Sequence, residues 1–379
     1  MNDRKRKIIA LTLIVSLIAI GLGHFLFDLE IQQKTADYVI ENRSGEKAES
    51  IKPVKYSHIS TKINNNKQEI DVLEVDLSTG KAEVFPALSH NSLFGFEELS
   101  KIAIKNNAYA AINGGFFYEY GDPSGMVVID GRLVTKSSGR YPVFTVKDKK
   151  AELKQIDNEM FMVHSGNKIN VSDINRMYKS GNVVLYTSVF GLNNRADISN
   201  TSITIENNKV TGVVKSKVPK VIPEGGMVLT FYEPYKYDFN KFPIKLGDNI
   251  EMICKPEITK DMQAYECGSW LVKDGDSVAP NKDDWVGLLT NYDPRTVVGI
   301  RQDGVVVLMT VDGRQPGYSV GVSAKELADF LIDYGVKDAA MLDGGASTEM
   351  ILNGKVINKP SFKGEERPLG GALIVRINE

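Results

Sequence analysis

Histidine is scarce in this chain, which has only His24, His58, His90 and His164. None of the four stands in a glycine-rich segment. A Ser-His-Asp hydrolase needs a histidine as its general base, and zinc sites commonly use histidine nitrogens as ligands. The sequence therefore argues against both kinds of site.

Nucleotide-binding signatures are missing as well. The chain has no G-x-G-x-x-G followed by an acidic residue at the dinucleotide-binding distance, and no G-x-x-x-x-G-K-[ST]. A strong excess of positive charge is also missing, because 46 Lys and Arg residues nearly balance 48 Asp and Glu residues. This composition gives no reason to expect nucleic acid as a partner.

Only two cysteines occur, Cys254 and Cys267, on either side of a loop that contains Pro256. A disulfide across the base of this loop is one interpretation if the domain is exported. Two buried free thiols are the other, because a bridge requires a Cα separation that spacing along the chain does not fix.

The N-terminus, in contrast, holds a long apolar run. Residues 1–7 form a basic segment that is expected to be cytoplasmic, and residues 8–27 form an uncharged stretch long enough to cross a bilayer as one helix. A cleaved signal peptide is the alternative. The run is long for a signal peptide and no clear A-x-A site follows it, so we predict a single-pass signal anchor in the cell membrane with the rest of the chain extracellular.

Two further regions follow the predicted anchor. Residues 28–68 are polar and show little periodicity, which predicts a stalk or linker. The folded domain is predicted to span residues 69–379, and a hydrophobic fraction of 42% gives the chain material for a sizeable core. No composition break divides this domain, although residues 171–260 are a candidate insertion or subdomain.

The pattern of apolar residues predicts both strands and helices. Alternation predicts a half-buried strand over residues 70–77, and helical spacing predicts a helix over residues 96–107. Turn dipeptides between β-rich runs predict three hairpins. Their turns are at Asp130-Gly131, Asn207-Asn208 and Asp303-Gly304.

A second helix has clear start and stop signals. Ser323 and Glu326 form a capping-box signature, an apolar face follows, and Gly335 is placed to end the helix. This helix lies between two apolar runs that predict strands, at residues 305–311 and 339–342. We therefore predict an α+β domain with a mixed β-sheet and a few helices.

Functional residue types are most concentrated just after Leu342. The apolar run before it is expected to deliver Asp343 to the mouth of a loop, where Gly344 and Gly345 allow crowded backbone conformations. Ser347 and Thr348 add hydroxyl groups, and the amides of such a loop can form an anion-binding nest. Taken alone, the Asp-Gly-Gly sequence is also typical of a tight turn with a solvated aspartate.

Other short segments are informative as well, and several of them place polar residues at the ends of apolar runs. In chain order they are Asn-Gly-Gly-Phe-Phe at 113–117, Val-Leu-Tyr-Thr at 184–187, Pro-Arg-Thr-Val-Val-Gly-Ile at 294–300, Val-Asp-Gly-Arg at 311–314, Glu-Leu-Ala at 326–328, Leu-Asp-Gly-Gly-Ala-Ser-Thr at 342–348 and Glu-Arg-Pro at 366–368. Together and in this order they resemble the phosphodiester glycosidase family, over about residues 69–379. Ala346 departs from the family, which commonly has a third glycine there.

The resemblance implies a hydrolase that cleaves the sugar C1–O bond of an N-acetylglucosamine-1-phosphodiester-like substrate. Such cleavage passes through an oxocarbenium-like state, so a carboxylate near C1 is valuable as nucleophile or base. Asp343 is the first candidate for this carboxylate and Asp312 the second. A phosphate leaving group is a weak base, so the reaction needs little protonation and one catalytic carboxylate is expected to suffice.

Arginine, glycine and hydroxyl residues are the candidates for holding the substrate. A guanidinium group can donate two parallel hydrogen bonds to two oxygens of one phosphate. The main-chain N–H groups of glycines can donate to the same phosphate, and amide or hydroxyl side chains can hydrogen-bond to sugar hydroxyls. The predicted substrate- and phosphate-binding residues are Asn113, Gly114, Gly115, Arg295, Thr296, Arg314, Gly344, Gly345, Ser347, Thr348 and Arg367.

Two alternatives stay open. Asp312, Asp343 and Glu349 offer oxygen ligands for Mg²⁺ or Ca²⁺, which would make the chain a metal-dependent phosphodiesterase that cleaves P–O. A non-catalytic module that binds phosphoglycan or takes part in exopolysaccharide assembly is the second. The preferred interpretation is a membrane-anchored extracellular enzyme without a cofactor, acting on a phosphodiester-linked glycan of the cell surface. The sequence does not specify the sugar, its anomer or the acceptor.

Overall fold

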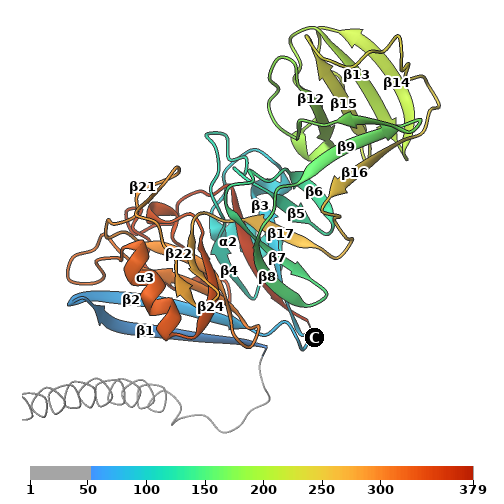
Figure 1. Ribbon diagram of the computed structural model, residues 1–379. Coiled ribbons are helices and arrows are strands. Elements are labelled where there is room, and N and C mark those ends of the chain that lie inside the picture. The colour runs from blue at the N-terminus through green and yellow to red at the C-terminus, as the bar shows by residue number, and fades with distance from the viewer. Residues whose placement is uncertain (1–52, 379) are drawn as a thin grey trace, which may run out of the picture. The chain divides into compact units, whose positions relative to one another are not determined.

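The computed structural model describes residues 53–378, drawn in colour in Figure 1. The predicted cytoplasmic segment, the predicted membrane helix and most of the predicted linker lie outside the described residues. Among the residues that are described, no helix is both long and apolar enough to cross a membrane. From Pro53 onward the chain forms one compact unit.

This unit consists mainly of β-sheets. Across residues 53–378 the only α-helices are α2 (Leu99–Lys105) and α3 (Ala324–Asp333), accompanied by the short 3-10 turns η1 (Ser89–Asn91), η2 (Ser188–Phe190) and η3 (Gly345–Ser347). The expectation of β-sheets with a few helices is therefore confirmed.

Two sheets form the body of the molecule. Sheet I has seven strands in the order β1 (Val54–Ile63), β2 (Asn66–Val75), β23 (Val306–Val311), β22 (Arg295–Arg301), β24 (Val336–Met341), β18 (Trp270–Lys273) and β19 (Asp276–Ser277). Sheet II has five, in the order β26 (Lys355–Val356), β25 (Met350–Leu352), β4 (Ala110–Asn113), β27 (Gly371–Ile377) and β3 (Ala82–Leu88).

Successive side chains of a strand point to opposite faces of its sheet, so each of the two sheets contributes to two different cores. The body therefore has four layers (Figure 1). Val298 and Leu308 of sheet I share a core with Ile112 and Leu373 of sheet II. Neighbouring residues on the other face of sheet I pack with α3, and those on the other face of sheet II pack with α2. The order of layers is therefore α3, sheet I, sheet II, α2.

Two additional sheets and a three-stranded sheet complete the unit. Sheet III contains β6 (Arg132–Thr135), β5 (Val127–Ile129), β17 (Gln263–Glu266), β7 (Pro142–Lys147) and β8 (Lys150–Gln155) in that order. Sheet IV contains β11 (Asp173–Ile174), β12 (Val183–Thr187), β15 (Met227–Tyr232), β13 (Asn200–Glu206) and β14 (Lys209–Ser216), and sheet V contains β10 (Asn167–Asn170), β9 (Glu159–His164) and β16 (Ile250–Lys255). A short ribbon pairs β20 (Lys282–Asp283) with β21 (Gly287–Leu288).

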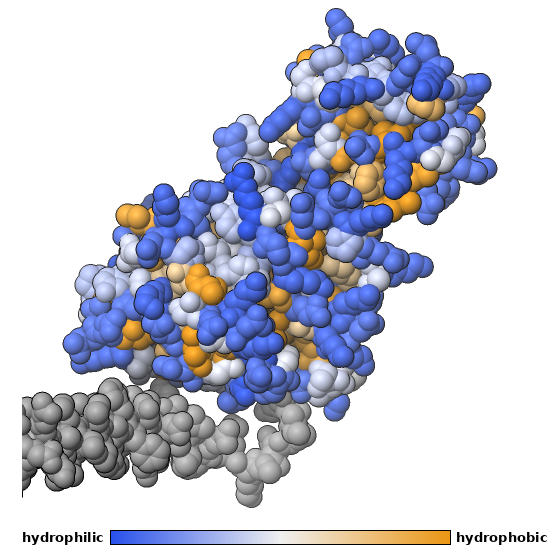
Figure 2. All heavy atoms as spheres, in the orientation of Figure 1, coloured by the Kyte–Doolittle hydropathy of each residue, from blue (hydrophilic) through white to orange (hydrophobic). Residues whose placement is uncertain are grey.

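Sheets IV and V form a lobe that is inserted between β8 and β17, the green to yellow region of Figure 1. A core of buried apolar residues joins the lobe to sheet III, since it contains Met162 and Leu229 of the lobe together with Val128 and Ala264 of sheet III. The face drawn in Figure 2 is mostly hydrophilic, with patches of apolar residues on the lobe and on the body. The candidate insertion at residues 171–260 thus corresponds to a lobe that begins earlier, at β9.

The prediction of a mixed sheet around α3 was wrong. Strands β23 and β24 are connected through α3, but both pair antiparallel with β22, which lies between them. Every neighbouring pair in sheet I is antiparallel, and the one parallel pair among the described strands is β11 with β12. A helical connection predicts two strands that run the same way, and it does not reveal that a third strand separates them.

The boundary between linker and domain was also predicted too late. Strand β1 lies in the segment predicted as a polar linker and pairs along its whole length with β2. Its polar side chains serve β2: the hydroxyl of Tyr56 donates to Asp71 at 2.7 Å, and His58 contacts Asp71 at 2.9 Å and Glu69 at 3.0 Å. Strand β2 is buried on both faces, and not half-buried as its alternation indicated, because Val72 lies in the core with α3 and Leu73 lies in the core between sheets I and II.

Local signals were more reliable. The three predicted hairpins are present as β5–β6, β13–β14 and β22–β23. The Ser323 hydroxyl accepts from the Glu326 main-chain N–H at 3.3 Å, the Glu326 carboxylate accepts from the Ser323 N–H at 3.0 Å, and Gly335 has a φ of +88° after the helix. Cys254 and Cys267 are free thiols, as in the second of the two predicted arrangements, but only Cys267 is buried and Cys254 is partly exposed.

Candidate functional site

The Asp343 loop lies where sheets I and II meet. The end of β24, the start of β22 and the end of β4 converge there: Leu342 N–H donates to the Thr296 carbonyl at 2.8 Å, and Asp343 N–H donates to the Gly114 carbonyl at 3.1 Å. The Asn-Gly-Gly segment and the Asp-Gly-Gly segment, far apart in sequence, are thus in direct contact.

Asn113 is the buried link between these segments. Its side-chain nitrogen donates to the Asp343 carbonyl at 2.6 Å, while its oxygen accepts from the Thr296 hydroxyl at 2.9 Å and from the Glu349 N–H at 3.2 Å. The Thr296 hydroxyl also lies 3.2 Å from the Thr348 hydroxyl. Asn113, Thr296 and Thr348 are buried and use these groups inside the protein, so they support the loop from behind, contrary to the sugar contacts predicted for them.

The carboxyl group of Asp343 has a strongly shifted pKa. Burial raises its pKa to about 6, while a hydrogen bond from Ser347, the charge of Arg367 and the Gly344 N–H act in the opposite direction. The residue nevertheless retains part of its exposure. A carboxyl group with this pKa is mostly ionised at pH 7 and is a better base than an ordinary aspartate.

Arg367 provides the cation beside this carboxyl. Its Nη1 donates to the Ser347 hydroxyl at 2.9 Å, and its guanidinium carbon lies 5.6 Å from the centre of the Phe117 ring. Ser347 and Phe117 come from the two predicted loops, and Arg367 is only partly buried. The guanidinium is therefore held in a fixed position with donors left over for a ligand.

Glu349 lies behind Arg367 and is fully buried. Its Oε1 accepts the Arg367 main-chain N–H, whereas its Oε2 has no hydrogen-bond partner among the described residues. Burial raises the pKa of Glu349 to about 8, assisted by Glu366 and Glu98 and opposed by Arg367. A neutral Glu349 at pH 7 leaves the positive charge of Arg367 available to the site.

The predicted nest of glycine amides is not formed. The N–H of Gly114 donates to the Gly371 carbonyl at 3.0 Å and that of Gly345 to the Pro294 carbonyl at 2.9 Å. The Gly115 N–H interacts with the Tyr265 hydroxyl, and the Gly344 N–H with the Asp343 carboxylate. Glycine is needed here because neighbouring groups pack directly against the main chain. A Cβ on Gly114, for example, would lie 2.6 Å from the Tyr265 hydroxyl.

The three predicted phosphate-binding arginines have different positions. Arg314 lies at the loop, where its guanidinium comes 3.1 Å from the place of a Cβ on Gly345, and its Nε donates to Asp293 at 2.9 Å. Its side chain is half exposed. Arg295 is 2% exposed and donates to the carbonyls of Val322 at 3.0 Å and Asn291 at 2.9 Å, so it holds main chain together and is not available to a ligand.

Asp312, the second predicted catalytic carboxylate, also forms hydrogen bonds within the protein. Its oxygens accept from the Asn358 side chain at 2.9 Å, the Lys359 N–H at 2.8 Å and the Tyr318 hydroxyl at 3.2 Å. Burial raises its pKa. Asp312, Asp343 and Glu349 do not form a group of metal ligands, and residues 53–378 contain no group of three or more His, Cys, Asp or Glu side chains suited to a metal ion.

Tyr265 is a site residue that the sequence did not reveal. It lies in β17, is 2% exposed, and its hydroxyl fits against Gly114 and Gly371. Burial raises its pKa, and the nearby charge of Asp343 adds to this effect. Tyr265 stands in a segment that mixes polar and apolar residues, between Ala264 and Glu266, so nothing there distinguishes it from an ordinary core tyrosine.

Comparison with known families gives one match, over residues 199–376, to the family described as phosphodiester glycosidase. Over 67 residues the chain is 40% identical to the N-acetylglucosamine-1-phosphodiester alpha-N-acetylglucosaminidase of Bos taurus, a match that covers 18% of this chain and 12% of that protein. Over 138 residues it is 33% identical to an uncharacterized SPbeta prophage-derived protein of Bacillus subtilis, covering 36% of this chain and 21% of that protein. The chain therefore matches only a small part of each of these relatives.

Solved structures share the fold. A hypothetical protein from Synechocystis has a TM-score of 0.72 at 17% identity, over 86% of this chain and 62% of that one. A protein from Burkholderia pseudomallei has a TM-score of 0.66 at 21% identity, over 82% of this chain and 74% of that one. At such identities the similarity concerns the fold alone.

Proposed function

Because residues 199–376 match the phosphodiester glycosidase family, we propose that the chain is a hydrolase that cleaves the sugar C1–O bond of a glycosyl-1-phosphodiester. The observation that carries the proposal is the arrangement of Asp343 and Arg367 around Ser347. It combines a carboxylate of raised pKa with a fixed, partly exposed guanidinium.

In this proposal Asp343 is the reacting carboxylate. It either attacks C1 or removes a proton from the water that does so, and its raised pKa suits the second role particularly well. The Ser347 hydroxyl donates to the carboxylate and orients it. Since Asn113 holds the Asp343 main chain, the carboxylate has little freedom to move away.

Arg367 is proposed to bind the phosphate that leaves. Its charge stabilises the negative charge that moves onto the phosphate as the C1–O bond breaks. Arg314, half exposed on the other side of the glycine loop, is the second candidate for a phosphate oxygen. The leaving group is a phosphate monoester, which is a weak base, so the mechanism requires no separate general acid.

The setting and the substrate are part of the proposal as well. The predicted signal anchor would hold the domain outside the cell membrane, where phosphodiester-linked surface glycans are available as substrates. The bovine relative is named for N-acetylglucosamine-1-phosphodiesters, which makes this sugar the first to test.

The test is hydrolysis of an N-acetylglucosamine-1-phosphodiester in oxygen-18 water by the full chain, with and without chelator. Attack at C1 places the label in the free sugar. We expect labelled sugar from the parent protein, no effect of chelator, and loss of turnover in Asp343→Asn. Asp303→Asn, an exposed carboxylate in the hairpin between β22 and β23, is the matched control and should retain activity.

The alternatives make different predictions for the same experiment. Label in the phosphate, with loss of activity on chelation, would identify a metal-dependent phosphodiesterase. Saturable binding of the phosphodiester without product would favour a phosphoglycan-binding or assembly module. Either result would contradict the proposed C1–O cleavage.

A further inference from the structure

A second cavity lies beside sheet III, and none of the residues proposed for hydrolysis lines it. Its volume is about 490 Å³, which is enough for a sugar-sized ligand. Four separate chain segments contribute to its wall. Residues used in the argument below are Tyr118, Lys136, Asp173, Arg176, Asp284 and Trp285.

Aromatic rings form one side of this cavity. Trp285 stacks on Phe116 with ring centres 5.5 Å apart and an angle of 7° between the planes, and Tyr118 meets Trp285 edge-on at 5.5 Å. Phe116 is buried, whereas Trp285 and Tyr118 are partly exposed. The stack on Phe116 therefore fixes the indole while leaving part of it open to the cavity.

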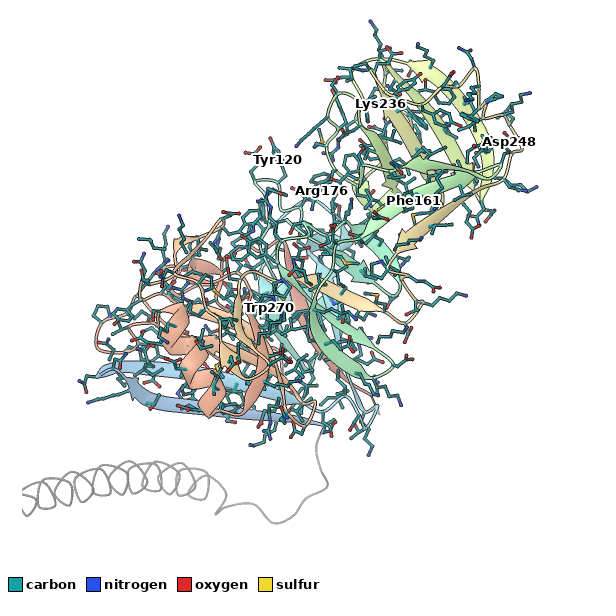
Figure 3. The ribbon with its side chains drawn as sticks, in the orientation of Figure 1. Tyr120, Phe161, Arg176, Lys236, Asp248 and Trp270 are labelled. Atoms are coloured by element: carbon teal, nitrogen blue, oxygen red, sulfur yellow. The ribbon has the colours of Figure 1, made fainter. Side chains whose placement is uncertain are left out.

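Charged side chains of both signs form the other side. Arg176, from the inserted lobe, donates to Asp122 at 2.9 Å and lies 5.3 Å from the centre of the Tyr118 ring. Figure 3 shows Arg176 next to the loop that carries Tyr120, between the lobe and the body. Asp173 interacts with the charges of Arg176 and Lys136 and uses one oxygen to accept the Ile174 N–H at 2.9 Å.

The cavity and the Asp343 site lie on opposite faces of one segment. Phe116 and Tyr118 point to Trp285, whereas Phe117 between them lies against Arg367. Successive side chains of an extended segment point in opposite directions, and the Phe117–Pro123 bridge shows that this segment is extended. The cavity is therefore a separate site.

We infer that this cavity binds a saccharide unit. A sugar ring has apolar C–H faces that suit the indole and phenol rings, and hydroxyl groups that both donate to Asp173 and accept from Arg176 or Lys136. A bare anion fits less well, because the carboxylates of Asp173 and Asp284 face the same space. A hydrophobic ligand would remove water from the remaining donors and acceptors of these charged groups without replacing its hydrogen bonds. The inference does not depend on the proposed hydrolysis.

The two tryptophans of the chain allow a direct test. The full chain carrying Asp343→Asn is applied to an array of oligosaccharides that contain N-acetylglucosamine and other bacterial surface sugars. The glycan that binds best is then titrated while tryptophan fluorescence is recorded. Trp270, on β18 of sheet I, provides the matched control.

We expect a saturable fluorescence change that persists in Trp270→Phe and disappears in Trp285→Phe. Arg176→Met and Asp173→Asn should each weaken binding about tenfold, as expected for loss of one hydrogen bond to a charged group. Both variants keep the Trp285 stack. Asp173→Asn should unfold thermally much like the parent, whereas Arg176→Met also loses the ion pair with Asp122 and should unfold at a lower temperature, so its affinity is measured well below that temperature.

Several results would overturn the inference. They are the absence of any bound glycan on the array, a fluorescence change that follows Trp270, and unchanged affinity in both Arg176→Met and Asp173→Asn. Two further results would do so: the same saturable change with inorganic phosphate but no glycan, and glycan binding by the parent protein that Asp343→Asn abolishes.

Discussion

Replacing Asp343 by asparagine is expected to remove activity and at the same time stabilise the folded protein at neutral pH. Folding raises the pKa of this carboxyl from 3.8 to about 6, mainly through burial. The folded state therefore keeps the Asp343 proton to higher pH than the unfolded chain does. As pH rises from about 4 to about 6, ionisation favours the unfolded state, and the full penalty remains at every higher pH.

The size of the penalty follows from the pKa difference. A change of about two units corresponds to about 3 kcal/mol, since each unit is worth 1.36 kcal/mol. Asp343 keeps some exposure, and asparagine also loses the charge-assisted hydrogen bond with Ser347, so the gain should be smaller. We expect Asp343→Asn to gain about 1 to 3 kcal/mol at pH 7.5 and almost nothing at pH 4.

The assay is urea unfolding of the parent protein and of Asp343→Asn across this pH range, followed by circular dichroism. Asp303→Asn is the control, because that carboxylate is exposed and its substitution should have little effect at either pH. A stability difference that is the same at pH 4 and pH 7.5, or a less stable Asp343→Asn at pH 7.5, would refute the idea that ionisation of the buried Asp343 carboxyl destabilises the folded protein.

Three further predictions concern two residues around the site and the N-terminal cap of α3. Glu349→Gln should unfold at similar urea to the parent at pH 4 but at higher urea at pH 9, because Glu349 ionises near its ordinary pKa of 4.5 in the unfolded chain and only near 8 in the folded protein, so the penalty grows between these two values; a difference that is the same at pH 4 and pH 9 would contradict this. Gly114→Ala should lower thermal stability by about 1 to 3 kcal/mol through overlap with the Tyr265 hydroxyl, and adding Tyr265→Phe should recover part of that loss, whereas purely additive losses would argue against the clash. Ser323→Ala should lower the free energy of unfolding by about 1 kcal/mol, because Ser323 caps the N-terminus of α3. Turnover per folded molecule should stay the same, and a loss of turnover would contradict the assignment of Ser323 to helix capping alone.

Parts of this protein were determined by residues close together in sequence. The Ser323–Glu326 capping box and the turns at Asp130-Gly131 and Asp303-Gly304 depend on contacts within a few residues, so their patterns are sufficient to predict them. Residues 339–342 likewise predicted the buried strand that delivers Asp343. The order of the short sequence segments also predicted the resemblance to the phosphodiester glycosidase family, and residues 199–376 match that family.

Other parts depend on how distant strands pair. Sheet I is antiparallel because β22 lies between β23 and β24. Strand β1 forms by pairing with β2 along its whole length, and its Tyr56 and His58 contact Asp71 of β2. Neither fact has a local signal, since a polar edge strand and a polar linker have similar composition.

Tertiary structure also decided what each polar residue of the site is free to do. The sequence placed Asp343, Ser347, Arg314 and Arg367 among the candidates, and the fold leaves partly exposed charges on Asp343, Arg314 and Arg367. It uses Asn113, Thr296 and Arg295 for internal hydrogen bonds instead. A sequence specifies which groups can donate or accept, but only the folded chain determines which of them already have partners and which remain for a ligand.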